Sequence, residues 1–247
     1  MTNQKTQPTA SVRRSWSRVA ILDNAVPTDL ADALWTRPNE LVALAEPLQC
    51  KGVRSTRLLT WASQRYVLKH YLEPSWWHTF KRHIQSSRAR ATWTVTHRLA
   101  DAGIATPRPV ACVENRLGPL QRDSYLMYPY VEGRTLRSCL AEEAAKSTAL
   151  EHLWDQLGQL WQRLAQLRAS LADTNVGNFI VCPAGHLWVI DLDKSRFHRL
   201  AHSAARQQER GWKFLLRSAA KHAGTAQALR PHHPGETTSA LLQAPRR

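Results

Sequence analysis

Three oxygen-bearing side chains in the second half of the sequence have the types and spacing that phosphoryl transfer requires. Asp173 and Asn178 lie five positions apart in "LADTNVGNF", and Asp191 follows thirteen positions later at the end of "LWVID". Such oxygens suit Mg²⁺, which takes few protein ligands and shares phosphate oxygens. A further Asp can accept or orient the proton of an attacking hydroxyl. The pattern predicts one Asp for the nucleophile and an Asn–Asp pair for a metal ion.

Simpler roles remain open for some of these residues. Asp191 could merely end a β-hairpin, and D-x-x-x-x-N alone is a weak motif. We expect Asn175, between the two loop residues, to be a turn residue. Asp193 could support the site from behind or cap the following loop.

The elements around these residues can be predicted from periodicity. "NFIVC" and "LWVID" flank "PAGH" and predict a hairpin. Leu and Trp residues three and four apart predict a helix from Ser147 to Leu167. Another helix should begin after Ser86 or Ser87 as N-cap and stop at Gly103.

The first half contains more strands. "TRLLTWASQRYVLKHYL" predicts two strands joined by a turn at Ala62–Gln64, and residues 104–133 predict further strands with a turn at Asn115–Pro119. Residues 21–50 read as short helical runs broken by Pro and Asn, and the chain after Asp193 reads as basic and helical. We therefore expect an α+β chain with a small β-sheet lobe and a helical lobe.

The expected domain organisation has four parts. They are a disordered tail (1–15), an N-lobe with a β-sheet and one helix (16–131), a helical C-lobe with the loop and hairpin (132–224), and a flexible C-terminal tail (225–247).

Charge is strongly positive and unevenly spread. The 247 residues carry a net charge of +15. Residues 51–98 hold ten Lys or Arg against one acid, and residues 194–247 hold eleven against two. Such regions attract polyanions such as nucleic acid, anionic lipid or a phosphorylated glycan. A solvated surface on a basic protein is the alternative.

Cysteine usage and hydropathy restrict the class of protein. The cysteines are far apart and form no CxxC pair, which favours a reducing compartment over a disulfide framework or zinc site. No apolar run reaches the roughly 18 residues of a membrane span. The polar N-terminus has no hydrophobic core of a secretion signal.

Five segments in order resemble one family. "LADTNVGNFIV" with "LWVIDLDKSR" looks like the catalytic and metal-binding segments of the lipopolysaccharide core kinases, the Kdo and heptose kinases. "RYVLKHY", "SSRARATWTVTHRLADAGIATPRPVACVE" and "SYLMYPYVEGRTL" are similar to that family's lysine strand, helix-and-strand passage, and hinge. The resemblance runs from about Leu48 to about Trp212 and implies a protein-kinase-like fold with two lobes.

The resemblance also implies roles for individual residues, with ATP and Mg²⁺ as cofactors. Asp173 matches the catalytic Asp, and Asn178 and Asp191 match the metal ligands. Lys69 matches the lysine that holds the α- and β-phosphates, although a surface lysine on an edge strand is the alternative. Further nucleotide contacts fall on the segment after the first strand and on the hinge: Gly52, Arg54, Ser55, Tyr128 and Tyr130.

The sequence departs from the family pattern at three places. Leu171 occupies the position of the catalytic-loop His, and Thr92 that of the helix Glu that pairs with the lysine. Glu73 or a distant acid would have to replace that Glu. The phosphate-covering segment has a single glycine, Gly52, in place of G-x-G-x-x-G.

The implied acceptor is a sugar of the lipopolysaccharide inner core, heptose or Kdo. The implied location is the cytoplasmic side of the inner membrane of a Gram-negative bacterium, with the chain bound peripherally to its anionic surface. The basic and aromatic segment "EPSWWHTFKRHIQSSRAR" suits such an interface, unless its tryptophans cover the sheet lobe.

Other functions remain open from the sequence. The departures favour a pseudokinase that acts as a binding or scaffolding protein. Charge alone supports a nucleic-acid-binding protein, but no known nucleic-acid-binding motif is present, so no nucleic acid partner is expected. An aminoglycoside-type kinase fits this basic chain poorly, because its cationic substrate would require an acidic pocket.

Overall fold

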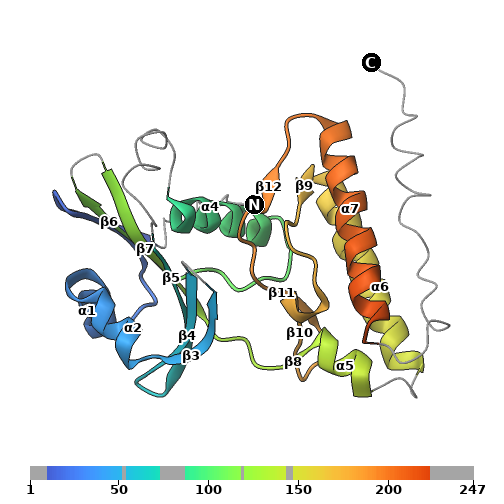
Figure 1. Ribbon diagram of the computed structural model, residues 1–247, viewed down its shortest axis with the longest axis horizontal. Helices are drawn as coiled ribbons and strands as arrows, with labels where there is room; N and C mark the ends of the chain where they lie inside the picture. The colour runs from blue at the N-terminus through green and yellow to red at the C-terminus, as the bar shows by residue number, and fades with distance from the viewer. Residues whose placement is uncertain (1–9, 52–53, 73–86, 118–119, 143–146, 223–247) are drawn as a thin grey trace, which may run out of the picture. The chain divides into compact units, whose positions relative to one another are not determined.

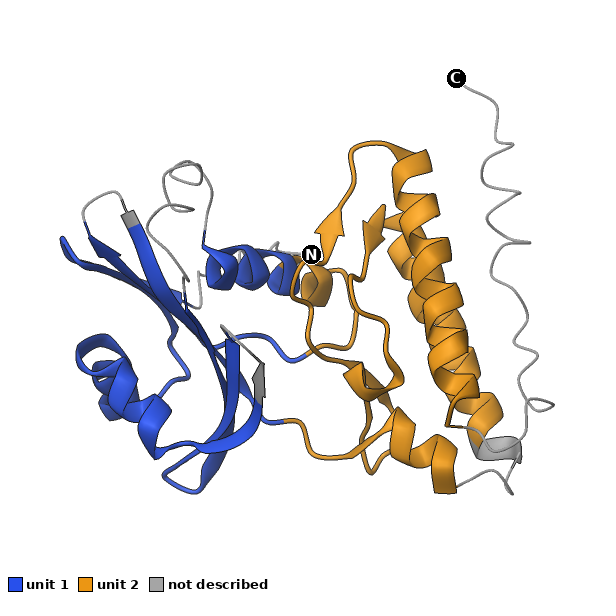
Figure 2. Ribbon diagram, viewed as in Figure 1, with its two compact units in different colours: residues 1–97, 107–130 blue, residues 98–106, 131–247 orange. Residues whose placement is uncertain are grey.

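The computed structural model describes residues 10–51, 54–72, 87–117, 120–142 and 147–222. The chain divides into two compact units (Figure 2), unit 1 (residues 1–97 and 107–130) and unit 2 (residues 98–106 and 131–247). The division after Tyr130 lies beside the boundary expected at residue 131. Residues 98–106, which we expected in the N-lobe, belong to unit 2.

Unit 1 contains a seven-stranded antiparallel sheet of order β1-β2-β6-β7-β5-β4-β3 (Figure 1). Its strands are β1 (Ala10–Arg14), β2 (Arg18–Asp23), β3 (Glu46–Lys51), β4 (Arg54–Trp61), β5 (Gln64–Tyr71), β6 (Ala111–Leu117) and β7 (Leu120–Pro129). The disordered tail expected for residues 1–15 is wrong for residues 10–14, because they pair with β2.

The turns of this sheet agree in part with the expectations. Ala62 and Ser63 have φ of 45° and 67° and join β4 to β5, as expected for a two-residue hairpin turn. The turn expected at Asn115–Pro119 was placed too early, because β6 continues to Leu117. Sequence periodicity also missed β2 and β3.

Helices cover both faces of the sheet (Figure 1). Tyr125 and Met127 of β7 pack with α1 (Thr28–Thr36) and α2 (Pro38–Leu44) in one buried cluster. Leu126 and Tyr128 pack on the other face against α4 (Arg88–Asp101). Successive residues of a strand point to opposite faces, which explains this alternation.

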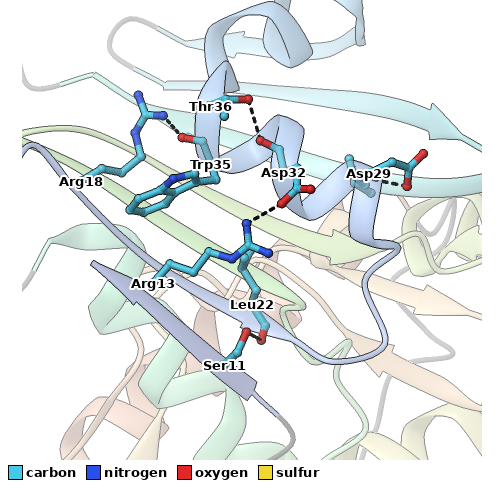
Figure 3. A network of polar contacts seen from close by, with 9 residues as sticks. Ser11, Arg13, Arg18, Leu22, Asp29, Asp32, Trp35 and Thr36 are labelled. Atoms are coloured by element: carbon cyan, nitrogen blue, oxygen red, sulfur yellow. Dashed lines mark hydrogen bonds and ion pairs between the residues drawn. The ribbon is translucent and has the colours of Figure 1, made fainter. Parts of the chain in front are cut away.

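Polar contacts fasten α1 to the outer strands (Figure 3). The Arg13 guanidinium donates to Asp32 Oδ1 of α1 at 2.6 Å. Arg18 of β2 donates to the backbone carbonyl of Trp35 near the end of α1. These contacts connect the middle of the helix to β1 and its C-terminal end to β2.

Unit 2 combines helices with two small sheets, of order β11-β10-β8 and β12-β9. Its elements are β8 (Arg134–Thr135), α5 (Leu136–Glu142), α6 (Ser147–Gln166), β9 (Ala169–Ser170), the 3₁₀ turn η2 (Val176–Asn178), β10 (Phe179–Val181), β11 (Leu187–Val189), β12 (Arg196–Phe197) and α7 (Ala201–Ala220). The structure confirms the expected hairpin as β10 and β11 and the expected long helix as α6.

The core of unit 2 lies between α6 and α7. The apolar stripe of α6 is buried at Leu153, Leu157, Trp161 and Leu164. The ring of Trp161 lies 4.9 Å from that of Trp212 of α7, nearly edge to face. In the described part of the chain, no helix combines the length and apolar character that crossing a bilayer would demand.

Candidate active site

The loop between β9 and β10 is shaped by its own polar side chains. Asp173 Oδ1 accepts a hydrogen bond from the backbone N–H of Asn175 at 3.2 Å. Asn175 Oδ1 in turn accepts from the N–H of Gly177 at 2.8 Å and from Arg137 of α5 at 2.9 Å. Asn175 is the N-cap of η2, so the turn role expected for it is confirmed.

Asn178 connects this loop to the residue before Asp191. Its side-chain Nδ2 donates to the backbone carbonyl of Asp173 at 3.1 Å, and its own carbonyl accepts from Ile190 N–H at 2.8 Å. The second bond extends the β10–β11 ladder by one pair. The structure thus brings Asp173, Asn178 and Asp191 to one end of the hairpin.

Asp191 has an uncommon backbone conformation. Its φ of 58° lies in the left-handed region, which a residue without glycine's freedom seldom adopts. Lys194, three positions later, has a φ of 65°. Such conformations persist only where the surroundings enforce them, and they cluster at functional sites. The backbone thus adopts the left-handed conformation at Asp191 and again at Lys194, soon after β11 ends.

Helix α7 is hydrogen-bonded to the loop through residues that were not predicted from the sequence. Thr174 Oγ1 donates to the carbonyl of Gly211 at 2.6 Å, and Ser218 Oγ accepts from Val176 N–H at 3.3 Å. The buried side chain of Gln208 donates to the carbonyls of Leu164 and Ala169. The sequence carried a signal for these residues, because Gln208 and Ser218 are polar residues on the core-facing side of an amphipathic helix.

A metal ion fits the donor chemistry of this loop and hairpin. The Nδ2 of Asn178 donates to the Asp173 carbonyl, so Oδ1 of the same carboxamide is the atom that could bind a metal ion. Within the described residues, no group of three or more His, Cys, Asp or Glu side chains gathers as a cage. Two protein oxygens suit Mg²⁺, which completes its shell with water and phosphate oxygens, better than zinc or a caged calcium ion.

Lys69 lies on the sheet of unit 1, on the face covered by α4. It sits opposite Thr56 of β4 and Leu126 of β7, and alternation from Val67 places its side chain on the α4 face. Its Nζ is 5.6 Å from the centre of the Tyr128 ring. It therefore lies on an interior strand, which removes the edge-strand alternative.

The remaining nucleotide-contact candidates also belong to unit 1. Arg54 and Ser55 begin β4, and Gly52 lies outside the described residues. The backbone N–H of Tyr130 donates to the carbonyl of Arg65 at 2.9 Å, and the Arg65 guanidinium lies 4.3 Å from the centre of the Tyr130 ring. Pro129 has no N–H. Neither Pro129 nor Tyr130 therefore has a backbone N–H left for a nucleotide.

Two of the three departures from the family pattern, Leu171 and Thr92, are buried. Leu171 is 7 % exposed and Thr92 on α4 is 3 % exposed. Leu171 therefore fills its position by packing. The N-cap of α4 is Ser87, whose Oγ accepts from Arg90 N–H at 3.0 Å, one of the two serines expected. Glu73 and most of the expected interfacial segment lie outside the described residues.

A half-buried polar network beside Lys69 was not anticipated. Asp123 of β7 contacts His70 Nε2 at 3.3 Å, and the His70 ring stacks on Tyr125 at 4.5 Å. The His70 bond, with bonds from Tyr125 and Asn115, lowers the pKa of Asp123 below its usual range. Burial, with the Asp123 bond, raises the pKa of the Tyr125 hydroxyl. The network ties β5 to β7, the strands that carry Lys69 and Tyr128.

Comparisons with known proteins give one consistent result. The chain matches the model of the lipopolysaccharide kinase (Kdo/WaaP) family over residues 34–232. It is 28 % identical over 138 residues to a 3-deoxy-D-manno-octulosonic acid kinase of Xylella fastidiosa (strain M12), covering 56 % of this chain and 52 % of that protein. It is 25 % identical over 156 residues to the corresponding kinase of Vibrio cholerae, covering 58 % and 63 %. The match thus spans about half to under two thirds of these relatives.

A solved structure shares the fold. The structure described as WaaP in complex with acyl carrier protein aligns with a TM-score of 0.63 at 17 % identity, covering 85 % of this chain and 84 % of that one. The expected α+β, protein-kinase-like fold is confirmed, with the seven-stranded sheet in unit 1 and the long helices α6 and α7 in unit 2.

Proposed function

This chain belongs to the lipopolysaccharide kinase (Kdo/WaaP) family, and we propose that it transfers a phosphoryl group from ATP to a hydroxyl of a heptose or Kdo sugar in the lipopolysaccharide inner core. The observation that carries the proposal is the double connection of Asn178, through its side chain to Asp173 and through its carbonyl to Ile190 beside Asp191. This connection supports an arrangement in which an acceptor base and two metal ligands act at one place.

In this proposal each side chain has a separate task. Asp173 orients the acceptor hydroxyl and takes up its proton as the oxygen attacks the terminal phosphorus of ATP. Asn178 Oδ1 and the Asp191 carboxylate would hold Mg²⁺, which would supply positive charge to neutralise the transferring phosphate. The attacking oxygen forms a bond to phosphorus, the bridging bond of ATP breaks, and ADP leaves.

The nucleotide would be held mainly by unit 1. Lys69 would contact the α- and β-phosphates, and its position over Tyr128 supports a side chain held in one direction. Gly52, Arg54 and Ser55 would cover the phosphates. Adenine would bind beside Tyr130, at the end of unit 1. The N–H of Tyr130 already donates to the Arg65 carbonyl, so the N–H of Val131, the next residue, is the candidate donor to adenine.

We also propose that the chain acts on the cytoplasmic side of the inner membrane, bound peripherally. The basic regions 51–98 and 194–247 support this, because each cation near an anionic bilayer contributes roughly 1 kcal/mol of binding. The acceptor itself would be an anionic glycolipid.

A pseudokinase is the second candidate, favoured by the apolar Leu171 and by Thr92 at a position where a kinase has an acid. Such a protein would bind nucleotide or glycolipid without transfer. It would act as a scaffold rather than as an enzyme.

Transfer of labelled phosphate distinguishes the two. The chain is incubated with γ-labelled ATP, Mg²⁺ and de-O-acylated lipopolysaccharide that lacks core phosphate, beside Asp173→Ala and the matched control Asp155→Ala, an exposed acid of α6. The kinase is supported if label appears in the glycolipid with the wild type and with Asp155→Ala but not with Asp173→Ala. ATP binding without transfer supports the pseudokinase. Acceptors that end in Kdo or in heptose then identify the sugar.

A further inference from the structure

A cavity of about 430 Å³ lies in unit 2 beside the proposed catalytic loop. Loop residues Ala172 and Thr174, which flank Asp173, line it on one side. The segment from Lys194 to β12 and the middle of α7 line the other sides. The cavity is far larger than the share of liquid volume that a water molecule takes, about 30 Å³, and lies in the range of small-molecule sites.

The lining is cationic. Lys194, Arg196 and His198 all line the cavity, Lys194 from the turn before β12, Arg196 from β12 itself and His198 from the residue after it. Phe197, between them, receives the Arg98 guanidinium 3.8 Å from its ring centre. Arg210 of α7 adds a further cation from across the cavity.

No acid of the described chain lines the cavity to neutralise these groups. The carboxylate of Glu209, next to Arg210, lies 2.6 Å from Lys213 Nζ. In the part of the chain that the structure describes, Lys194, Arg196 and Arg210 line the cavity and form no salt bridge. His198 is fixed by a 2.8 Å hydrogen bond between its Nε2 and Ser170 Oγ.

The backbone fixes these side chains with respect to the loop. Arg196 of β12 pairs with Ser170 of β9, two positions before Ala172. Ser195 Oγ lies 3.4 Å from Ala172 N–H. The carbonyl of Gly211, next to Arg210, accepts the Thr174 hydroxyl. Both walls of the cavity are thus bonded to the residues on either side of Asp173.

We propose that this cavity is a subsite for an anionic sugar of the acceptor, whose carboxylate or phosphate is bound by Arg196, Arg210 and Lys194 while Asp173 addresses the reacting hydroxyl. The inference rests on the proposed function and deepens it. A bare phosphate would leave most of the volume empty, whereas a monosaccharide that carries the anion fills it. Arginines suit the task, because their planar guanidinium binds carboxylate and phosphate in a bidentate manner.

The first test measures anion binding alone. Thermal unfolding is followed with inorganic phosphate, without nucleotide, at ionic strength matched with chloride. The pocket variant is Arg196→Gln with Arg210→Gln. The control is Arg206→Gln with Arg217→Gln, two exposed α7 cations that do not line the cavity. Phosphate is expected to stabilise the wild type and the control but not the pocket variant. Equal stabilisation of all three, or of none, would overturn the site.

The second test measures kinetics with soluble, de-O-acylated acceptor. The pocket variant is expected to raise KM for the acceptor at least tenfold and to leave KM for ATP within twofold of wild type. Acceptor whose carboxylates have been reduced and whose phosphates have been removed should raise wild-type KM to the same extent and affect the pocket variant little. Phosphate binding with unchanged acceptor KM would assign the cavity to a free anion and overturn the acceptor role.

The two tests separate this inference from the proposed function. A wild type that binds phosphate in the cavity but transfers no label would overturn the kinase assignment, and with it the acceptor role of the subsite. Normal transfer with no effect of the pocket variant on either measurement would overturn the subsite alone.

Discussion

The side-chain amide of Asn178 donates to the backbone carbonyl of Asp173 at 3.1 Å, so the proposed metal ligand also fixes the shape of the proposed catalytic loop. The two tasks use different atoms of one carboxamide, Nδ2 for the loop and Oδ1 for the metal. An aspartate at this position would keep an oxygen for the metal but lose the donor to the loop. An alanine would lose both.

Replacement of Asn178 should separate these tasks. Asn178→Asp keeps an oxygen ligand but loses the donor to Asp173, and we expect it to retain Mg²⁺-dependent ATP binding while kcat falls about 10–100-fold. Asn178→Ala should lose both, and its Mg²⁺-dependent ATP binding should weaken as well. Calorimetric titration with MgATP, together with initial rates, checks this. Equal behaviour of the two variants would contradict the division of labour.

Asn175→Ala should destabilise the loop without changing the affinity for nucleotide. The Asn175 carboxamide caps η2 through Gly177 N–H and binds Arg137, and loss of a cap costs about 1 kcal/mol of stability. Thermal unfolding should therefore show a lower Tm, while affinity for ATP stays within twofold. Asn175→Asp, which keeps the acceptor oxygen, is the matched control and should retain most of the Tm. A Tm unchanged in Asn175→Ala would show that the cap is not needed.

The fold and the loop were predicted where the signal is local. The α6 stripe, the Ser87 cap and the Ala62–Ser63 turn each depend on residues a few positions apart, so periodicity and turn chemistry identified them. β2 was missed, because its strand character depends on pairing with β6, which is distant in the sequence. β3 was missed although it pairs with β4, the next strand along the chain.

The support of the site was harder to predict for the same reason. Gln208 bonds to carbonyls 44 and 39 positions away, and no local pattern encodes such partners. The cationic cavity likewise requires β12 and α7 to meet, which only the folded chain shows.

Gln208→Leu should be among the more destabilising single changes in unit 2. It leaves the buried carbonyls of Leu164 and Ala169 without their donor, at a cost of about 1–3 kcal/mol in the free energy of unfolding. Urea unfolding measures the change, with the exposed Gln162→Leu of α6 as control. Identical midpoints for the two variants would rule out a structural role for the Gln208 amide.

Asp123 should make stability depend on acid pH. Its pKa is lower in the folded protein than the ordinary value of 3.8, chiefly because of the His70 hydrogen bond, so the carboxylate stabilises the fold at neutral pH. That contribution is full above the unfolded pKa and disappears as pH falls through it and then through the folded pKa. Asp123→Asn should therefore lose about 1–3 kcal/mol at pH 7 and progressively less below about pH 4.

Urea unfolding of wild type and Asp123→Asn at neutral pH and at several values below pH 4 tests this dependence. The two free energies of unfolding should converge as the pH falls. A difference that stays constant with pH would show that the charge of Asp123 is not what stabilises the network.

The central claim is that Asp173 and Asp191 act at one site with different tasks, and the most direct test measures Mg²⁺-dependent ATP binding and phosphate transfer for Asp173→Ala and Asp191→Ala side by side. We predict that Asp191→Ala loses Mg²⁺-dependent binding and transfer, whereas Asp173→Ala binds MgATP as the wild type does and transfers no phosphate. Full transfer by either variant, or the same loss of binding in both, would contradict the account.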